Sequence, residues 1–220
     1  MRVPGGRVVA AALTCSVLGL SIAACGGSKE RQDANEPSGD FPVNVAVAKF
    51  PSRQRLADTS DLRLKIENPG KQTLPNLAIT IYTGDMKASE PFNVRSDQAG
   101  LADPNRPIWI LEENYPKLLA PEIPVTEVGK APSAGAETAN TDTYAFGSVR
   151  PGDSVDALWR VTPVKAGTYT VHYEISAGLY GKAKAVTRDG SKVEGEFVVT
   201  ISDKPPKTRV SDSGKVETVN

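Results

Sequence analysis

Between residues 41 and 202, apolar and polar side chains alternate, a pattern typical of strands with one buried and one solvent-exposed face. The alternating apolar residues that we expect to face inward are Val43, Val45 and Val47; Leu62, Leu64 and Ile66; Leu77, Ile79 and Ile81; Val155, Ala157, Trp159 and Val161; Tyr169, Val171, Tyr173 and Ile175; and Phe197, Val199 and Ile201. Turn sequences such as Asn68-Pro69-Gly70 and Asp189-Gly190 separate these segments, and no stretch has a convincing helical period. The sequence therefore predicts an all-β fold, an antiparallel β-sandwich.

The segment from about 84 to 142 interrupts this alternation. It is rich in proline and includes a run of small and polar residues at 133–140. Only Ile108-Trp109-Ile110-Leu111 has the composition of a strand. Because long structureless loops are uncommon in compact domains, we expect residues 84–142 to be an insertion into the sandwich that carries one short strand.

The N-terminal segment has the composition of an export signal. Arg2 and Arg7 precede an apolar run over residues 8–25 that ends in small side chains, the pattern of a secretory signal peptide. Within it, Ile22-Ala23-Ala24-Cys25 resembles the lipobox of bacterial lipoproteins. The resemblance implies that the Cys25 sulfur is diacylated and that the signal, 1–24, is cut off before it. An uncleaved membrane helix, or an ordinary signal in which Cys25 has no role, remain as alternatives.

These patterns divide the chain into a lipoprotein signal peptide at 1–24, a flexible tether at 25–40, the sandwich at 41–202 and a disordered tail at 203–220. Removing the two arginines of the signal leaves 24 of the 26 basic side chains against 26 acidic ones, a formal charge of −2. A balanced charge gives no indication of nucleic-acid binding. We expect an extracytoplasmic protein held on the cell membrane by its lipid, since two acyl chains anchor stably.

The second half of the sandwich resembles bacterial immunoglobulin-like modules of the cell-adhesion-related and fibronectin-like types. The resemblance rests on the Pro151-Gly152 turn, on Trp159 and on the Gly167-Thr-Tyr169 sequence. It implies that Trp159 lies in the core and that the Tyr169 hydroxyl bonds back to the preceding corner, as in a tyrosine corner. The chain departs from the common pattern in its long insertion and in lacking a cysteine pair. Such a fold accommodates many functions and identifies none.

The residues that carry most enzyme chemistry are scarce. His172 is the only histidine, so neither a zinc cluster nor a convincing Ser-His-Asp triad can be assembled. The pair Glu112-Glu113 is adjacent in sequence, and neighbouring residues on a strand point to opposite faces. Asp97, Asp103 and Asn105 offer oxygen ligands at a spacing that matches no known calcium loop. We therefore expect no catalysis, no metal and no cofactor.

Aromatic residues are the remaining candidates for a binding site, since tyrosine and tryptophan often anchor interfaces. Among Trp109, Tyr115, Tyr144 and Tyr180, we single out Trp109 and Tyr115 as candidate partner-binding residues. The simpler interpretation of Trp109 is an apolar pin that holds the insertion on the sandwich. The sequence thus favours a non-catalytic docking or scaffolding module that contacts an envelope protein. The alternative is a module that binds cell-wall carbohydrate through Trp109 and nearby tyrosines.

Overall fold

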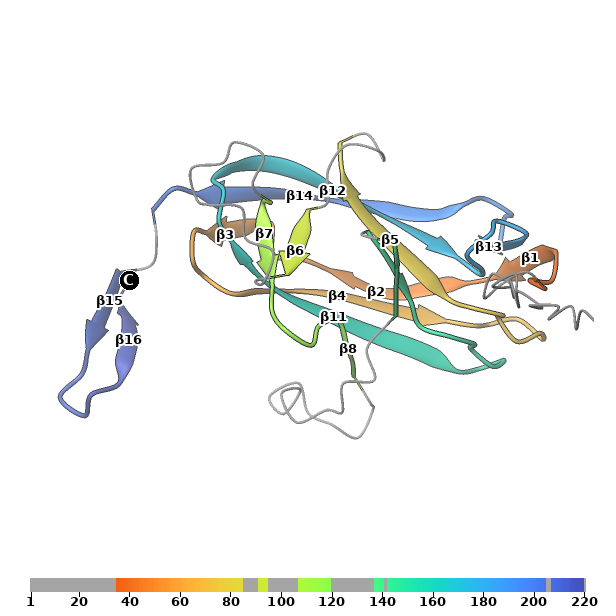
Figure 1. Cartoon of the computed structure of the whole chain (residues 1–220), viewed down its shortest axis with the longest axis horizontal. Helices are drawn as coiled ribbons and strands as arrows, with labels where there is room; N and C mark the ends of the chain where they lie inside the picture. Colours follow the sequence, from red (N-terminus) through yellow and green to blue (C-terminus); the bar gives the residue numbers. More distant parts are fainter. Residues whose placement is uncertain are drawn as a thin grey trace, which may run out of the picture. The chain divides into compact units, whose positions relative to one another are not determined.

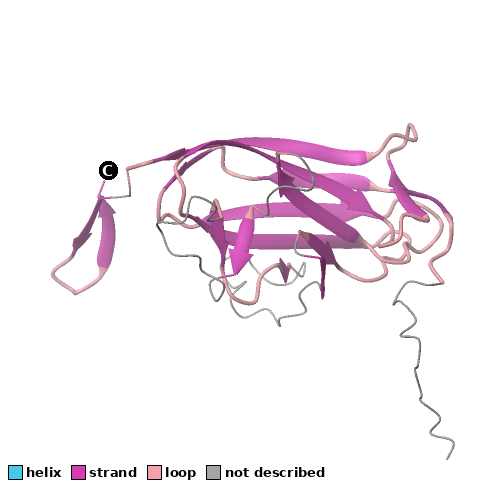
Figure 2. Cartoon of the chain, turned by 45° about the horizontal axis from the view of Figure 1, so that its top comes forward, coloured by secondary structure: helices cyan, strands magenta, loops and turns pink. Residues whose placement is uncertain are grey.

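The computed structural model describes residues 35–84, 91–94, 107–119, 137–140, 142–204 and 207–219. Every regular element in these ranges is a β-strand, and most strands belong to two sheets that lie one above the other (Figures 1 and 2). No helix in the described ranges is long and apolar enough to cross a membrane. The predicted all-β, immunoglobulin-like sandwich is confirmed.

The first sheet has the order β2-β4-β11-β7-β6, and β8 also pairs with β11. Its strands are β2 (Asn44–Lys49), β4 (Ser60–Glu67), β11 (Ser154–Pro163), β7 (Trp109–Leu111), β6 (Phe92–Val94) and β8 (Lys117–Leu118). Neighbouring strands are antiparallel except β6 and β7, which are parallel. The long β4–β11 pair, from Ser154 opposite Glu67 to Val161 opposite Ser60, forms the centre of this sheet.

The second sheet has the order β3-β14-β12-β5-β10-β9. Its strands are β3 (Arg53–Arg55), β14 (Val193–Ser202), β12 (Gly167–Ser176), β5 (Ala78–Thr83), β10 (Thr143–Ala145) and β9 (Glu137–Asn140). All neighbours are antiparallel except β3, which runs parallel to the end of β14.

The core fills the space between the two sheets, as the alternation predicts. Inward-facing residues of β4, β5, β11 and β12 are almost completely buried, among them Leu64, Ile79 and Trp159. The polar residues between them form the outer faces, because a strand turns successive side chains to opposite sides. A one-residue slip in register would expose the whole apolar set, so burial fixes the pairing.

Two local features predicted from the immunoglobulin-like resemblance are present. Trp159 is fully buried. The Tyr169 hydroxyl donates a hydrogen bond of 2.9 Å to the Ala166 carbonyl, which closes the corner before β12. Gly167 has a positive φ of 145°, and a Cβ atom there would lie 2.8 Å from the Tyr169 hydroxyl oxygen, so the corner favours glycine at this position.

The insertion holds more strand structure than the sequence predicts. Besides β7, which contains the expected Trp109–Leu111 segment, the described parts of 84–142 include β6, β8 and β9. Each is only two to four residues long. These strands lack a periodic pattern of their own because each is added to the edge or end of a longer neighbour, so the prediction of a single strand was wrong.

The structure also differs from the predictions at both ends. The tether was predicted to reach residue 40, yet Glu36 is buried and β1 (Gly39–Pro42) pairs in parallel with β13 (Ala183–Val186). The tail was predicted to be disordered from 203, yet β15 (Lys207–Val210) and β16 (Val216–Val219) form an antiparallel hairpin. The signal segment and Cys25 lie outside the described residues.

Candidate functional site

The chain changes sheets between β2 and β3, and this crossing builds the edge on which the candidate site lies. Strand β2 pairs with β4 in the first sheet, whereas β3 pairs with β14 in the second. Phe50, at the crossing, points into the core. As a result, β3 is a short strand that pairs with β14 on one side and has no neighbour on its other side in the described part of the chain.

Trp109 supports β3 from the core side. Its side chain is fully buried, and its indole Nε1–H donates a 2.7 Å hydrogen bond to Oε1 of Gln54, the central residue of β3. The Gln54 side-chain nitrogen donates in turn to the Pro51 carbonyl at 3.0 Å. Since a buried polar group is costly without a partner, these two side chains satisfy each other and fix the position of β3.

An aromatic cluster surrounds this hydrogen bond. The Trp109 ring lies 5.6 Å from Phe50, 5.8 Å from Phe92 and 5.9 Å from Tyr169, measured between centroids. Edge and tilted contacts of this kind add to the stabilisation that burial supplies. Trp109 therefore occupies the position of a pin between the insertion and the sandwich. Its side chain is fully buried, and a partner-binding role for Trp109 stays a prediction.

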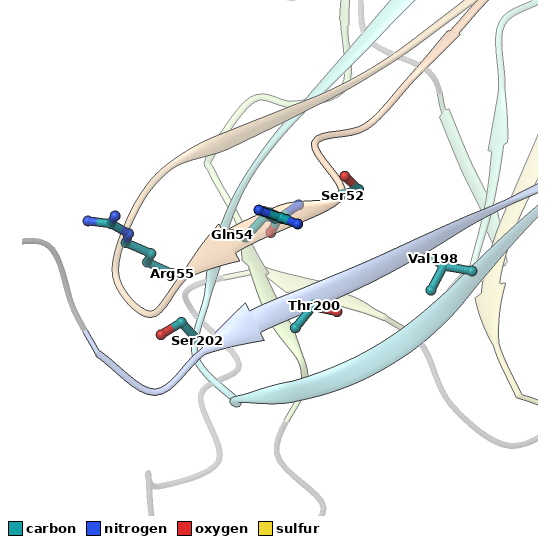
Figure 3. A pocket seen from close by; sticks show the side chains of 7 residues that line it. Ser52, Gln54, Arg55, Val198, Thr200 and Ser202 are labelled. Carbon is teal, nitrogen blue, oxygen red and sulfur yellow. The ribbon is translucent and has the colours of Figure 1, made fainter.

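On the solvent side of Gln54, β3 and β14 form a shallow groove of about 740 Å³ (Figure 3). The residues that line it are Ser52, Arg53, Gln54, Arg55, Val198, Thr200 and Ser202. Arg53 and Arg55 are exposed, and they share a face because they alternate with the buried Gln54. The groove thus combines two guanidinium groups, three hydroxyl groups and one exposed apolar side chain.

The two groove arginines differ from those on the other sheet in having no acidic partner. On the first sheet, Arg63 makes paired hydrogen bonds of 2.8 and 2.6 Å to Asp156, and Arg160 makes paired bonds to Asp61. No described carboxylate forms an ion pair with Arg53 or Arg55. Guanidinium groups suit bidentate binding of carboxylate or phosphate, so this groove is suited to an anionic group.

Tyr115 lies away from this groove, on the outer side of the first sheet. Its ring is partly buried, with Lys117 Nζ 4.9 Å and Arg160 Cζ 5.6 Å from its centroid. Burial raises the pKa of the Tyr115 hydroxyl, and the nearby Arg160 charge partly opposes this rise. Leu158 and Leu119 pack beside it. Trp109 and Tyr115 therefore have different neighbours and do not form one aromatic platform.

The other candidate residues form no reactive cluster in the described chain. The ring of His172 stacks on Tyr82 with centroids 5.1 Å apart, and its Nδ1 lies 3.7 Å from a Glu196 oxygen. Glu112 and Glu113 follow β7 in a turn. No group of three potential metal ligands occurs among the described residues. Asp97, Asp103 and Asn105 lie outside the described ranges.

Sequence reasoning missed Arg53 and Arg55. The basic-polar-basic pattern of residues 53–55 is too short to indicate a strand, and nothing local shows that it pairs with a segment almost 150 positions later. The signal that was available is Phe50-Pro51, an apolar residue and a strand breaker that mark a change of direction.

No family model and no curated protein matches the chain. Among solved structures, the chain is similar to the CARDB domain of PF1109 from Pyrococcus furiosus, with a TM-score of 0.40 and 10% identity over 76% of this chain and 99% of that domain. It is also similar to a cohesin module of a Clostridium perfringens family 33 glycoside hydrolase, with a TM-score of 0.37 and 9% identity over 74% of this chain and 98% of that module. These are likenesses of fold. The class that the strand order defines is an immunoglobulin-like β-sandwich module.

Proposed function

We propose that this protein is a non-catalytic docking module, anchored in the cell envelope through a lipid on Cys25, and that it contacts its partner through the groove between β3 and β14. The observation that carries the proposal is the pair of exposed arginines, Arg53 and Arg55, which have no acidic partner among the described residues. On the first sheet, by contrast, Arg63 and Arg160 are paired with aspartates.

The partner chemistry follows from the lining of the groove. Two guanidinium groups beside the hydroxyls of Ser52, Thr200 and Ser202 can bind an anion and donate further hydrogen bonds to it. Such a lining suits an acidic segment of an envelope protein. Trp109 and Gln54 support β3 and so fix the strand that carries both arginines before a partner binds. This preorganisation lowers the entropy cost of binding.

A carbohydrate-binding module is the second candidate. The glycan would bind in the same groove and not at Trp109, because Trp109 is buried. The arginines and hydroxyls fit an anionic cell-wall glycan by the same chemistry as an acidic protein segment. A neutral glycan is not favoured, because none of the described residues that line the groove is aromatic and could stack on a sugar ring.

The test is photo-crosslinking in cells from a crosslinking amino acid at Thr200, which lies in the groove and leaves both arginines intact. We expect one dominant protein adduct, absent when the crosslinker is placed at the exposed Lys184 instead. Adducts that a glycan-degrading enzyme removes would favour the second candidate. No adduct from a folded protein at the membrane would refute docking through this groove.

The anchor is tested separately. We expect Cys25→Ala to abolish incorporation of labelled palmitate and to release the protein from the membrane fraction. A variant that keeps its label or its membrane association would contradict the assignment of Cys25 as the lipid attachment site.

A further inference from the structure

In the described part of the chain, part of the edge of β14 next to the groove has no paired strand. Strand β14 pairs with β12 along its length, whereas on its other side Val186 bridges Lys192 and β3 covers only Thr200–Ser202. The Thr200 N–H donates to the Ser52 carbonyl at 2.8 Å, which shows that the even-numbered peptide groups of β14 face away from β12. By the same periodicity, those of Glu194, Glu196 and Val198 face away from β12, where no described strand pairs with them. A row of unpaired peptide groups is a template for another strand.

The side chains along this unpaired edge are mainly acidic on the outer face. Glu194 lies directly opposite Glu174 on β12, and Glu174 also lies 4.0 Å from Lys192 Nζ; Glu196 lies opposite His172, with 3.7 Å between its Oε2 and the imidazole Nδ1. These are non-hydrogen-bonded pairs, in which side chains approach most closely, and like charges in such a pair are destabilising. Val198, the next residue on this face, is 54% exposed. A strand with basic outer side chains would offset the repulsion.

Strand β3 shows how a strand docks on this edge. It runs parallel to β14, with Arg53 opposite Thr200 and Arg55 opposite Ser202. Its basic residues point outward while Gln54 points into the protein. A second strand placed in line with β3, also parallel to β14, would follow the same rule, with basic residues outward over Glu194 and Glu196.

Strand β15 of this chain has that pattern. In β15, the basic residues Lys207 and Arg209 alternate with the uncharged residues Thr208 and Val210. The Ser211 N–H bonds to the Lys215 carbonyl, so the odd-numbered peptide groups of β15 face β16 and those of Thr208 and Val210 face the other way. In a parallel pair with β14, Lys207 and Arg209 would then lie opposite glutamates. Val210, which is 68% exposed, would turn inward.

A groove of mixed lining lies at the start of this edge. It has a volume of about 920 Å³, and its lining includes the apolar Val45, Tyr173 and Val193 together with the charged Arg188 and Glu194. In this register the inward-turned Thr208 of an added strand would lie opposite Gly195, next to the groove, and Val210 would lie opposite Phe197. Burial there would remove an exposed valine from water, which is favourable.

The added strand must come from another molecule. Only residues 203–206 separate β14 from β15. A parallel connection needs a dozen residues or more, and a tight antiparallel return would meet the position that β3 already occupies. We propose that two copies of this chain form a dimer in which β15 of each copy adds in parallel to the β14 edge of the other at Glu194–Val198. This is the isologous exchange that twofold symmetry requires.

The first test uses disulfide trapping in the full, membrane-bound chain. A Glu196→Cys chain and an Arg209→Cys chain carry different epitope tags and are expressed together. We expect a covalent dimer that contains both tags, at a yield roughly tenfold above the matched pair Lys65→Cys with Arg209→Cys, whose first cysteine lies on the other sheet. A yield equal to that of the control, from chains that fold as judged by circular dichroism, would overturn the dimer.

The second test exchanges charges and introduces no cysteine. Sedimentation of the detergent-extracted chain should show a dimer that Glu196→Lys weakens by about tenfold or more, because each of the two symmetric strand pairings loses a cross-strand charge pair and gains a repulsion. Adding Arg209→Glu to the same chain should restore it. Weakening without restoration, or a monomer at all concentrations, would contradict the proposal and leave the acidic edge as protection against aggregation. Docking through Arg53 and Arg55 is tested independently of both results.

Discussion

The N-terminal segment is held on the sandwich by a buried carboxylate, and this contact can be broken from either side. Both oxygens of Glu36 accept backbone hydrogen bonds, from the Tyr180 N–H at 2.8 Å and from the Ala183 N–H at 2.6 Å. The carboxylate occupies a space over Gly178, where an added Cβ atom would overlap it. We therefore expect Gly178→Ala to expel Glu36 as effectively as Glu36→Ala removes it.

The magnitude follows from the two bonds. Hydrogen bonds to a charged group contribute about 1.5 to 3 kcal/mol each, and an unsatisfied buried amide costs about 1 to 3 kcal/mol. Water can reach part of the opened space, so we expect each single substitution to lower the free energy of opening this segment by about 2 to 3 kcal/mol. The double variant should cost no more than either single one, because both act through one contact.

Hydrogen exchange measured by mass spectrometry or NMR is the assay, with the amides of Tyr180, Ala183 and Phe41 as reporters. Phe41 lies on β1, which pairs with β13 beside the contact. We expect faster exchange at all three amides in both single variants, with unchanged exchange in the β4–β11 pair. Wild-type protection at Ala183 in folded Gly178→Ala protein would refute the reasoning, as would additive effects in the double variant.

Two further predictions concern the core and a turn. Trp109→Ala should lower the free energy of unfolding by about 3 to 5 kcal/mol, because it empties a large buried site. Gln54→Leu should lower the free energy of unfolding by about 1 to 3 kcal/mol, because it leaves the indole N–H unpaired. Urea denaturation measures both losses, and a loss below about 1 kcal/mol for Trp109→Ala would contradict its role as a pin. Hydrogen bonds from Thr187 and Ser191 lower the pKa of Asp189 from 3.8. Their support of the turn is therefore complete above the ordinary value and is lost as the pH falls through the lowered pKa; an Asp189 pKa at or above 3.8 in an NMR titration would show that these bonds do not form.

The main sheets could be predicted from the sequence because each long strand carries its own alternation. Leu62, Leu64 and Ile66 can face only one way without exposing apolar area, and the same holds for Tyr173 and Ile175. Their burial follows from local pattern alone. The tyrosine corner was likewise predictable, because Gly167 and Tyr169 are two residues apart.

The remaining elements depend on contacts between distant positions, which no local pattern reveals. Strand β1 is ordered by β13 and by the cradle for Glu36, more than 140 residues away. The burial of Trp109 with a satisfied indole N–H depends on Gln54, which lies 55 positions earlier. The candidate site shares this dependence, since Arg53 and Arg55 acquire a common face only once β3 pairs with β14.

The proposed docking role depends on Arg53 and Arg55, which form no ion pair with a described carboxylate. The most direct measurement compares crosslinking yield from Thr200 in cells between Arg53→Gln/Arg55→Gln protein and a matched Arg63→Gln/Arg160→Gln protein, in which two aspartate-paired arginines of the other sheet are neutralised. We expect the first pair of substitutions to abolish the dominant adduct and the second pair to leave it unchanged. Equal yields from both proteins would contradict the proposed docking role.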